Sequence, residues 1–250
     1  MITQPLAYPV ASGPAIAIEA RNLGKIYGPN WALRGVDLDV AEGEAVAVFG
    51  ANGAGKSTLV RLLATLALPS LGTIRLVGRD AVRSARSVRR TLGVLLHQNY
   101  LYPELTAAEN LALYAQLYGV RDVAGRVRES LESVELAAVA TRRAREMSRG
   151  MQQRLALARA TIHEPDVLLL DEPDSGLDER GSECLARLLA RGRSRGQTVV
   201  MATHRLEMGL ELCQRALVLA RGRGVYLAPT EAHSADEWHA LYRGLCANRP

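Results

Sequence analysis

Apolar residues along the chain recur with two different periods. Short alternating or continuous apolar runs are typical of strands, and several of these runs end in polar residues. The runs at 166–170 and 198–203 are almost entirely apolar, which is typical of central strands that are buried on both faces of a parallel sheet. Strands are therefore predicted at 16–18, 36–40, 45–49, 72–78, 91–96, 166–170, 198–203, 215–219 and 224–227.

Helical spacing dominates between about residues 100 and 160. Thr106 and Glu109 match a capping box, which opens a run of apolar residues at helical intervals. Helices are predicted from residue 106 and at 122–134, 152–162, 178–195 and 231–245. Together the patterns predict an α/β fold: a mainly parallel sheet, an antiparallel β portion near the N-terminus, and an inserted all-helical subdomain at about 100–160.

A glycine-rich stretch between the predicted strand 45–49 and a helical pattern matches the phosphate-binding loop, G-x-x-x-x-G-K-[ST]. Glycines allow backbone N–H groups to point inward around an anion, and the following helix adds its positive N-terminal end. The lysine of such a loop reaches the β- and γ-phosphates, and the next hydroxyl ligates Mg²⁺. The sequence therefore predicts a nucleotide site at Gly50, Ala51, Asn52, Gly53, Ala54, Gly55, Lys56, Ser57 and Thr58.

Lysine is otherwise almost absent from the chain. Only Lys25 and Lys56 occur, and every other basic residue apart from histidine is arginine. A compact ammonium at position 56 indicates that the loop needs a point charge rather than the planar fork of a guanidinium. This composition favours a phosphate-binding loop over a glycine-rich turn that binds nothing.

Two carboxylates follow the predicted strand 166–170. At the end of a buried parallel strand they face the crevice in which α/β folds bind ligands. Asp171 is expected to hold Mg²⁺ through water, and Glu172 to orient or deprotonate the water that attacks the γ-phosphate. The alternative is that these two carboxylates bind nothing and are simply solvated at the end of the strand. His204 follows the strand at 198–203, where it serves either a structural role or as a hydrogen-bond partner of the γ-phosphate.

Composition sets further bounds on the chain. Its 250 residues are 48% hydrophobic and 23% charged, as in an ordinary globular protein, and no apolar run approaches the ~18 residues of a membrane-spanning helix. The three cysteines, Cys184, Cys213 and Cys246, fit neither a disulfide framework nor a zinc site, so reduced thiols of a cytosolic protein are expected. Residues 1–15 lack a secretory pattern and are predicted to be a loose tail.

The net charge of +5 is distributed unevenly. Residues 75–90 contain six arginines and a single acid, Asp80. The run is either a solvated face or a contact for anionic lipid headgroups or an acidic partner. No nucleic acid is expected, because no aromatic-interleaved basic stretch or recognition motif accompanies the charge.

Aromatic residues near the predicted site leave two alternatives open. Tyr27 lies in a turn-rich segment, where it either stacks on an adenine base or packs in the core. Tyr100 and Tyr102 lie in a loop before the helical subdomain. They either pack under that subdomain or form a docking surface for a short helix of a partner subunit, because such aromatics are enriched at interfaces.

The order of these motifs resembles the nucleotide-binding domain of ABC transporters over residues 16–227. The matching positions are the adenine-stacking Tyr27, the Walker A loop Gly50 to Thr58, the Q-loop Gln98, the Walker B strand 167–171, the catalytic-type Glu172, the D-loop 175–178 and the switch His204. The resemblance implies that Glu172, His204, Lys56 and Gln98 serve catalysis and that Ser57, Gln98 and Asp171 hold Mg²⁺. It also implies one ATP-binding domain at 16–230 and a short helical extension at 231–250.

The signature of that family, usually LSGGQ, departs from its pattern here. It reads Met147-Ser148-Arg149-Gly150-Met151, so arginine and methionine replace a glycine and the glutamine. The form is similar to the S-[KR]-G-M variant that is common among ABC-2-type exporters. Ser148 is a good helix N-cap, and Ser148 and Gly150 leave a hydroxyl and N–H groups for a phosphate. By resemblance, that phosphate belongs to the ATP of a partner subunit.

The resemblance implies ATP hydrolysis coupled to a separate membrane-spanning permease subunit, in a head-to-tail dimer of two ATP-binding domains at the cytoplasmic face of the membrane. Residues 92–119 further resemble ATPase subunits assigned to haem export for cytochrome c maturation. A non-transport ABC ATPase acting in repair, translation or regulation is the alternative. A P-loop GTPase is excluded, because the guanine-reading N-K-x-D is absent. The transported substrate stays open.

Overall fold

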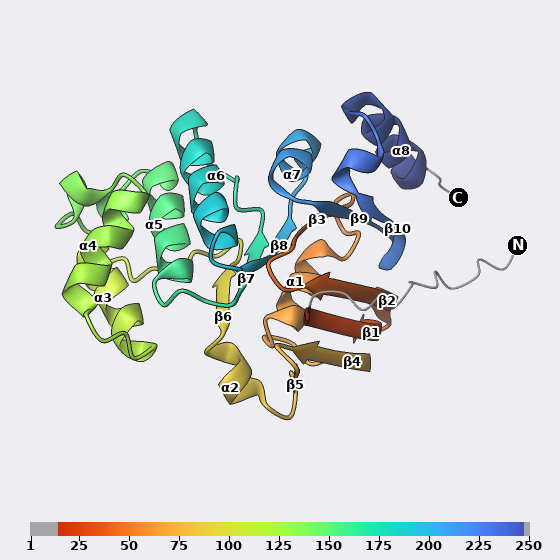
Figure 1. Ribbon diagram of the computed structural model, residues 1–250, viewed down its shortest axis with the longest axis horizontal. Helices are drawn as coiled ribbons and strands as arrows, with labels where there is room; N and C mark the ends of the chain where they lie inside the picture. Colours follow the sequence, from red (N-terminus) through yellow and green to blue (C-terminus); the bar gives the residue numbers. More distant parts are fainter. Residues whose placement is uncertain (1–14, 248–250) are drawn as a thin grey trace, which may run out of the picture.

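The computed structural model describes residues 15–247, and the expected tail at 1–14 lies outside this range. A six-stranded sheet is the centre of the molecule (Figure 1). Its strands are β3 (Ala45–Phe49), β6 (Leu92–Leu95), β7 (Val167–Asp171), β8 (Thr198–Ala202), β9 (Arg215–Ala220) and β10 (Arg223–Pro229). Their order is β10-β9-β3-β8-β7-β6, and all neighbours are parallel except β10 and β9.

A second, antiparallel sheet of four strands lies beside it. Its strands are β1 (Ile16–Tyr27), β2 (Asn30–Ala41), β4 (Leu71–Leu76) and β5 (Arg79–Asp80), in the order β2-β1-β4-β5. β1 and β2 are much longer than the predicted 16–18 and 36–40. Shifts of register interrupt their alternation, one of them at Asn22, whose φ is 47°. Such bulges hide the period of two that the sequence pattern needs.

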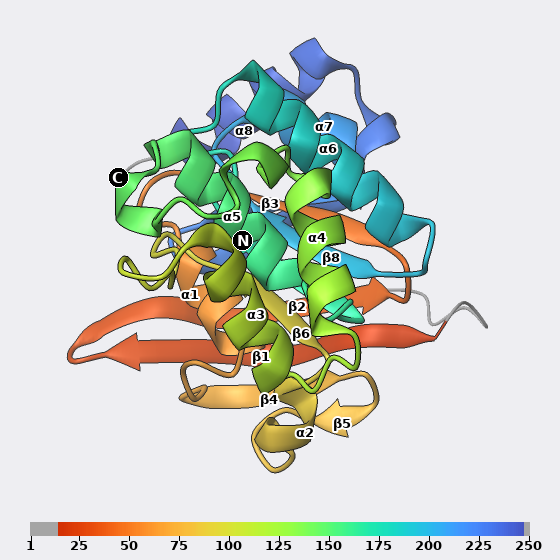
Figure 2. The same ribbon diagram turned by 90° about the vertical axis from the view of Figure 1, so that its left-hand side faces the viewer.

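Helices pack against the sheets, and those that lie between β6 and β7 in the chain gather at one end of the molecule (Figures 1 and 2). They are α1 (Lys56–Leu63), α2 (Ala85–Arg89), α3 (Ala107–Leu117), α4 (Val123–Ser133), α5 (Arg149–Thr161), α6 (Glu179–Arg193), α7 (Leu206–Leu212) and α8 (Ala235–Ala247), with short 3-10 helices at Ala137–Val139, Ala144–Glu146 and Thr230–Ala232. Between β6 and β7 the elements are helical, so the expected inserted helical subdomain is confirmed. None of the helices in the described range is long and apolar enough to cross a membrane.

The core forms because β3, β7 and β8 bury both of their faces. In β3, Val46 and Val48 join one apolar cluster with α1 and the four-stranded sheet. Ala47 and Phe49, on the opposite face, join another with α5 to α8. All five residues of β3 are buried. A strand in this position must be apolar throughout, which explains why the sequence pattern identifies it.

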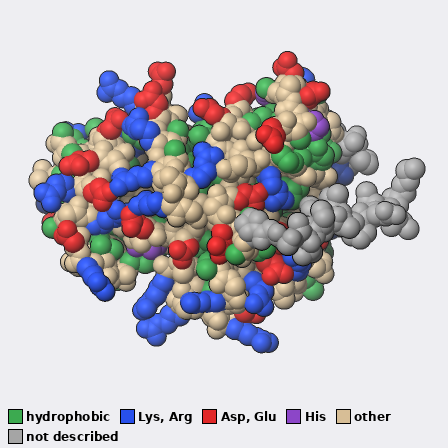
Figure 3. Space-filling model, in the orientation of Figure 1, with side chains coloured by type: hydrophobic (Ala, Val, Ile, Leu, Met, Phe, Trp, Pro, Cys, Tyr) green, Lys and Arg blue, Asp and Glu red, His purple; other side chains and the backbone are tan. Residues whose placement is uncertain are grey.

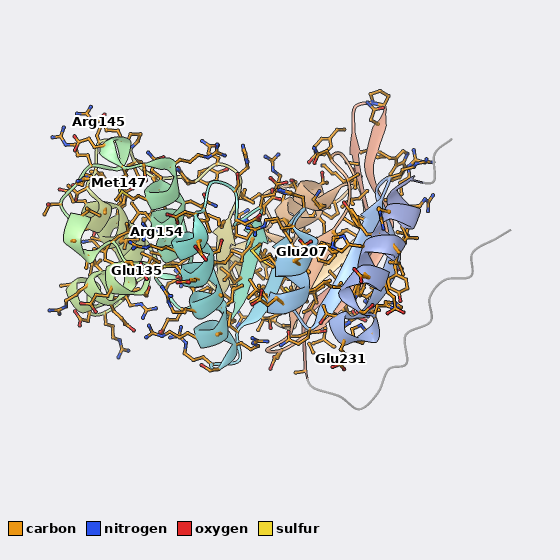
Figure 4. All side chains as sticks on the ribbon, turned by 90° about the horizontal axis from the view of Figure 1, so that it is seen from above. Glu135, Arg145, Met147, Arg154, Glu207 and Glu231 are labelled. Atoms are coloured by element: carbon orange, nitrogen blue, oxygen red, sulfur yellow. The ribbon has the colours of Figure 1, made fainter. Side chains whose placement is uncertain are left out.

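The helical subdomain begins as predicted. Thr106 and Glu109 form the capping box, in which Thr106 Oγ1 accepts from the N–H of Glu109 at 3.1 Å and the Glu109 carboxylate accepts from the N–H of Thr106 at 2.8 Å. Figure 4 labels Arg154 and Glu135, which lie in two segments of the same subdomain. Arg154 on α5 donates to the carbonyl oxygens of Val134 and Glu135 at 2.9 and 3.4 Å.

Ion pairs join the helical subdomain to α6 and to the loop before β7. Glu129 of α4 pairs with Arg126 and with Arg191 of α6, Glu135 pairs with Arg187, and Glu164 pairs with Arg126 and Arg195. Glu129 and the four arginines line a recess of about 250 Å³ between α4 and α6. The arginines of this recess are therefore neutralised within the chain.

The C-terminal helix α8 is anchored by one tryptophan. Trp238 is fully buried, and its Nε1 donates to the carbonyl oxygen of Thr230 at 2.8 Å. His239 on the same helix pairs with Glu207 of α7 at 2.9 Å. The helix was expected at 231–245; instead a 3-10 turn occupies 230–232 and α8 starts at Ala235. Buried aromatic contacts of this kind make α8 part of the domain core.

His163 lies where α5, α3 and β6 meet. Its ring stacks on Tyr118 with centroids 3.6 Å apart, and its Nε2 lies 3.1 Å from the carbonyl oxygen of Leu92. Burial lowers the pKa of His163 to about 4, and the nearby charge of Arg159 adds to this effect. The neutral imidazole is therefore the form that the fold accommodates.

The low pKa of His163 predicts an acid-sensitive fold. A group whose pKa is depressed on folding binds more protons when unfolded, so stability is lost as the pH falls from 6.5 toward 4. Between pH 7 and pH 5 this residue should lower the free energy of unfolding by about 2 kcal/mol. Urea unfolding at both pH values should show a smaller decrease in His163→Gln, while His97→Gln, which removes an exposed histidine, should behave as wild type. Equal decreases in all three proteins would contradict the assignment.

Candidate nucleotide-binding site

The phosphate loop connects the end of β3 to the start of α1, as the motif requires. Lys56 is the first residue of α1 and is 6% exposed. Its Nζ donates to the carbonyl oxygen of Gly50 at 2.7 Å and to that of Ala51 at 3.3 Å. The loop is therefore already closed around the ammonium group, while Asn52, Gly53 and Ser57 face solvent.

Two glycines of the loop are required by the packing around it. A Cβ at Gly50 would lie 2.6 Å from the carbonyl oxygen of Leu219. Gly55 has a φ of 109°, and a Cβ there would lie 2.7 Å from the carbonyl oxygen of Ala32. Neither position can carry a side chain without moving backbone. These close contacts hold the loop against β9 and β2. They fix the position of the N–H groups that are expected to bind an anion.

Asp171 meets the phosphate loop across the sheet. It is the last residue of β7, and its Oδ1 accepts from the Ser57 hydroxyl at 3.0 Å. Asp171 is only 3% exposed, and burial raises the pKa of this carboxyl while the Ser57 hydrogen bond opposes the rise. A buried carboxylate beside a hydroxyl is a typical pair of oxygen ligands for Mg²⁺. Two of the three predicted metal ligands, Ser57 and Asp171, are therefore side by side.

Glu172 and His204 also lie together. Glu172 has a φ of 51°, which non-glycine residues rarely adopt, and its N–H donates to the carbonyl oxygen of Ala202 at 2.8 Å. The turn places its carboxylate 3.8 Å from Nδ1 of His204. β8 carries His204 directly beside β7, so two strand ends supply both groups. The geometry brings a carboxylate and an imidazole to the rim next to Asp171.

Other predicted residues lie apart from this group. Gln98 is exposed and makes no hydrogen bond within residues 15–247, so the structure does not join it to Ser57 or Asp171. Tyr27 is 47% exposed at the end of β1, with the ammonium of Lys25 5.1 Å from its ring centroid. The core-packing alternative for Tyr27 is therefore wrong, and the Lys25 ammonium lies over one face of its exposed ring.

Ser148 is the N-cap of α5, as expected, because its Oγ accepts from the N–H of Met151 at 3.3 Å. Helix α5 begins at Arg149, three residues before the predicted start at 152, because the signature itself forms its first turn. Within the described range no hydrogen bond joins Ser148 or Gly150 to the phosphate loop of the same chain. That arrangement fits their expected use by a second subunit.

Arg149 makes a contact that the sequence did not reveal. Its Nη2 donates to Ser175 Oγ at 3.0 Å, and its side chain lies across Gly176, where a Cβ would come within 2.8 Å of the arginine Nε. Gly176 has a φ of 80°. In addition, Gln153 Nε2 donates to the carbonyl oxygen of Pro173 at 3.0 Å. The start of α5 is therefore fastened to the loop that follows Glu172.

These contacts enclose a polar cavity of about 250 Å³, and its lining comes from three segments of one chain. The lining residues are His97, Asn99, Arg149, Gln152, Gln153, Glu172 and Ser175. A further buried pair, Thr203 and Asp174, joins the ends of β8 and β7 by a 3.2 Å hydrogen bond. Sequence reasoning missed both features because they depend on which loops meet. The one signal in the sequence was Asp174, an acid three residues after Asp171.

Comparison with known proteins identifies the family. Residues 33–175 match the family model described as ABC transporter. The chain is 38% identical over 226 residues to the Nod factor export ATP-binding protein I of Paraburkholderia xenovorans (strain LB400), covering 90% of this chain and 74% of that protein. It is 42% identical over 212 residues to the daunorubicin resistance ATP-binding protein DrrA3 of Streptomyces coeruleorubidus, covering 83% and 66%.

Solved structures agree with this match. A dimeric ATP-binding cassette in a post-hydrolysis state, bound to ADP and Pi, superposes with a TM-score of 0.80 at 28% identity, covering 86% of this chain and 100% of that one. The chain therefore belongs to the ABC transporter family. It has the ABC ATPase fold with an antiparallel β subdomain and a helical subdomain, and it is an ATP-hydrolysing enzyme.

The Arg149 contact leads to a testable expectation. Because the side chain is exposed, Arg149→Ala should leave the Tm unchanged and remove only the link between α5 and Ser175. A hydrogen bond of this kind contributes about 1 kcal/mol, so ATP turnover should fall severalfold while ATP affinity of the isolated chain is kept. Arg145→Ala, which removes an exposed arginine four residues earlier, is the control. Unchanged turnover in Arg149→Ala would show that the contact is incidental.

Proposed function

We propose that this chain is the ATP-hydrolysing subunit of an exporter, and that it acts on a separate membrane-spanning partner. The observation that carries the proposal is the meeting of three adjacent strand ends. The phosphate loop after β3, His204 after β8 and the carboxylates at the end of β7 lie at one edge of the sheet. This is the set of groups that phosphoryl transfer to water requires.

Binding of ATP is assigned to the loop and to Tyr27. Lys56, now bonded to the carbonyl oxygens of Gly50 and Ala51, is placed to exchange them for β- and γ-phosphate oxygens. The N–H groups of the loop and the N-terminus of α1 add donors along the phosphate chain. Tyr27 offers an exposed ring to the adenine. Its stacking does not read base edges, so it gives affinity without selecting the base.

The residues present fit a Mg²⁺ ion. Ser57 Oγ and Asp171 Oδ1 are 3.0 Å apart and both are oxygen donors. We assign the ion to these two groups, with Gln98 as a third ligand once its loop turns inward. When bound, Mg²⁺ neutralises charge on the β- and γ-phosphates. The cluster of Asp171 and Glu172 favours such a cation, because two neighbouring carboxylates repel each other.

The hydrolytic step is assigned to Glu172. Its carboxylate lies beside His204 and lines the polar cavity next to the signature helix. From there it would accept a hydrogen bond from a water and direct it at the γ-phosphate. His204 would donate to a γ-phosphate oxygen and stabilise the charge that develops on it. Lys56 stabilises the same charge from the opposite side.

A second ATP-binding domain is part of the proposal. Ser148 and Gly150 lie outside the chain's own phosphate site, and α5 presents its N-terminus beside them. In a head-to-tail dimer they would contact the γ-phosphate held by the partner domain. The solved structure of a similar cassette is described as dimeric, which supports this arrangement. Replacement of the usual glutamine by Met151 leaves the backbone donors of the signature in place.

Export is the direction we propose, because the relatives compared above are named for Nod factor export and for daunorubicin resistance. These names give no support to haem as the transported substrate, so we propose export without assigning a substrate. The chain would lie at the cytoplasmic face of the membrane, where ATP is available and a permease subunit can be reached. A non-transport ABC ATPase is the alternative, and copurification of a membrane protein with the tagged chain distinguishes the two.

The loop 99–103 is the proposed contact for that permease subunit. Tyr100 and Tyr102 are 45% and 51% exposed, and the Tyr102 ring also lies 6.4 Å, centroid to centroid, from the ring of Tyr114 on α3. The loop is held through its backbone: buried Asn110 bonds to the N–H and carbonyl groups of Tyr102, and Tyr114 donates to the carbonyl oxygen of Tyr100 at 2.7 Å. A fixed loop with two half-exposed aromatic side chains suits docking.

Replacing Glu172 by glutamine tests the hydrolytic assignment. Glu172→Gln should retain ATP binding, because the phosphate contacts remain, and lose turnover by a factor of roughly 10²–10⁴. Size measurements with and without Mg-ATP should then show an ATP-dependent dimer that persists. Glu179→Gln, an exposed acid at the start of α6, serves as control. Turnover close to wild type in Glu172→Gln would remove this residue from the reaction.

The docking assignment is tested with Tyr100→Ala and Tyr102→Ala. Because the backbone contacts of the loop survive these changes, the Tm and the basal ATPase of the isolated chain should stay near wild type. Assembly with the permease subunit, or stimulation of ATPase by it, should fall. Leu117→Ala, which truncates a 71% exposed residue at the end of α3, is the matched control. A large drop in Tm, or unchanged stimulation, would contradict the docking assignment.

A further inference from the structure

A dense group of exposed arginines lies around α2 and β5. Arg75, Arg79, Arg83, Arg86, Arg89 and Arg90 are all exposed. In Figure 3 the basic side chains along the lower edge project from the region where Figure 1 places α2 and β5. Between them lies an open recess of about 550 Å³ that is also lined by Ser84, Ser87 and Thr91. We call this surface, with the apolar residues described below, the basic-aliphatic face.

Four of the six arginines of this face are not paired within the described residues, whereas Arg75 lies 3.9 Å from the Glu19 carboxylate and Arg89 bonds to Thr65. The guanidinium groups of Arg79, Arg83, Arg86 and Arg90 make no hydrogen bond or ion pair anywhere in residues 15–247. Asp80 is the one acid within 75–90, and its Oδ1 is occupied by the N–H groups of Val82 and Arg83 at 2.9 and 2.8 Å. In the recess between α4 and α6, by contrast, every lining arginine pairs with a glutamate.

Exposed aliphatic side chains lie directly beside the arginines. Leu68 is 64% exposed and Val82 is 47% exposed, and both line a small groove together with Arg89. Arg89 donates to the side chain and the carbonyl oxygen of Thr65 at 2.8 and 3.1 Å, which holds the 65–69 loop against α2. Leu66 in the same loop is 56% exposed. Cations and aliphatic groups are therefore fixed side by side.

A membrane surface is the partner that satisfies both features. Anionic headgroups provide phosphates for several guanidinium groups at once, and the interface accepts aliphatic side chains next to them. Nucleic acid does not fit, because residues 75–91 contain no aromatic side chain on which a base could stack. We infer that the basic-aliphatic face binds anionic phospholipid headgroups at a membrane surface.

The position of the basic-aliphatic face agrees with the proposed function. Lipid binding by this face does not require ATP. Helix α2 leads straight into β6, and the docking loop 99–103 follows that strand. Lipid contact would then add to the permease contact as a second, weaker attachment.

The test is sedimentation of the purified chain with vesicles, without nucleotide or permease. The wild type should bind vesicles of phosphatidylcholine with phosphatidylglycerol, ignore vesicles of phosphatidylcholine alone, and be released by salt. The variant with Arg79, Arg83, Arg86 and Arg90 each changed to glutamine should lose binding by a factor of about a hundred or more, because each cation near an anionic surface contributes about 1 kcal/mol. Leu68→Ala with Val82→Ala should weaken binding severalfold at unchanged charge.

A control variant with the same loss of charge makes the result specific. Arg121, Arg128, Arg142 and Arg180 are exposed elsewhere, and their change to glutamine should leave vesicle binding within about twofold of wild type. An equal loss in the control, or no binding by the wild type, would overturn the proposal. Binding of a poly-glutamate peptide but not of vesicles would overturn it in favour of an acidic protein partner. Basal ATPase and the Tm should be unchanged throughout, so failure here is separate from failure of the proposed function.

Discussion

The site depends on the parallel order of three neighbouring strands. β3, β8 and β7 end at one edge of the sheet, and they carry the phosphate loop, His204 and the two carboxylates. Ser57 and Asp171 are 114 positions apart in sequence, yet one hydrogen bond joins them. Because no local segment can create this proximity, the sheet must be complete before the nucleotide site exists. Burial of both faces of β3, β7 and β8 is what holds that order.

A change of backbone direction separates two adjacent acids at this edge. Asp171 still belongs to β7 and stays buried against Ser57, whereas Glu172 turns away with a φ of 51°. A non-glycine residue in this conformation costs roughly 1–3 kcal/mol, and the surroundings must hold it. Here the carbonyl oxygen of Ala202 binds the Glu172 N–H. The result is one carboxylate placed for a cation and another placed beside His204.

The sequence predicts the parts of this arrangement that one segment carries by itself. The buried strands, the phosphate loop and the carboxylates follow from apolar runs and a local motif. The long hairpin of β1 and β2 was underestimated because bulges break its alternation, and α2 and α7 are too short to show a helical period. The contacts of Arg149 with Ser175 and of Asp174 with Thr203 join separate loops. Such contacts depend on the assembled fold, so no pattern along the chain announces them.

Arginine serves two different purposes in this molecule, and pairing distinguishes them. Between α4 and α6, arginines pair with glutamates. Each exposed pair contributes little to the free energy of folding, but several together fix the position of the helical subdomain on the core. That placement matters because α5 carries both the signature and the attachment to the loop after Glu172. Around α2, six arginines are gathered beside one acid of the same segment, Asp80, which costs free energy in the isolated chain. A fold that neutralises its arginines in one place and concentrates them in another retains the second group for a partner outside the chain.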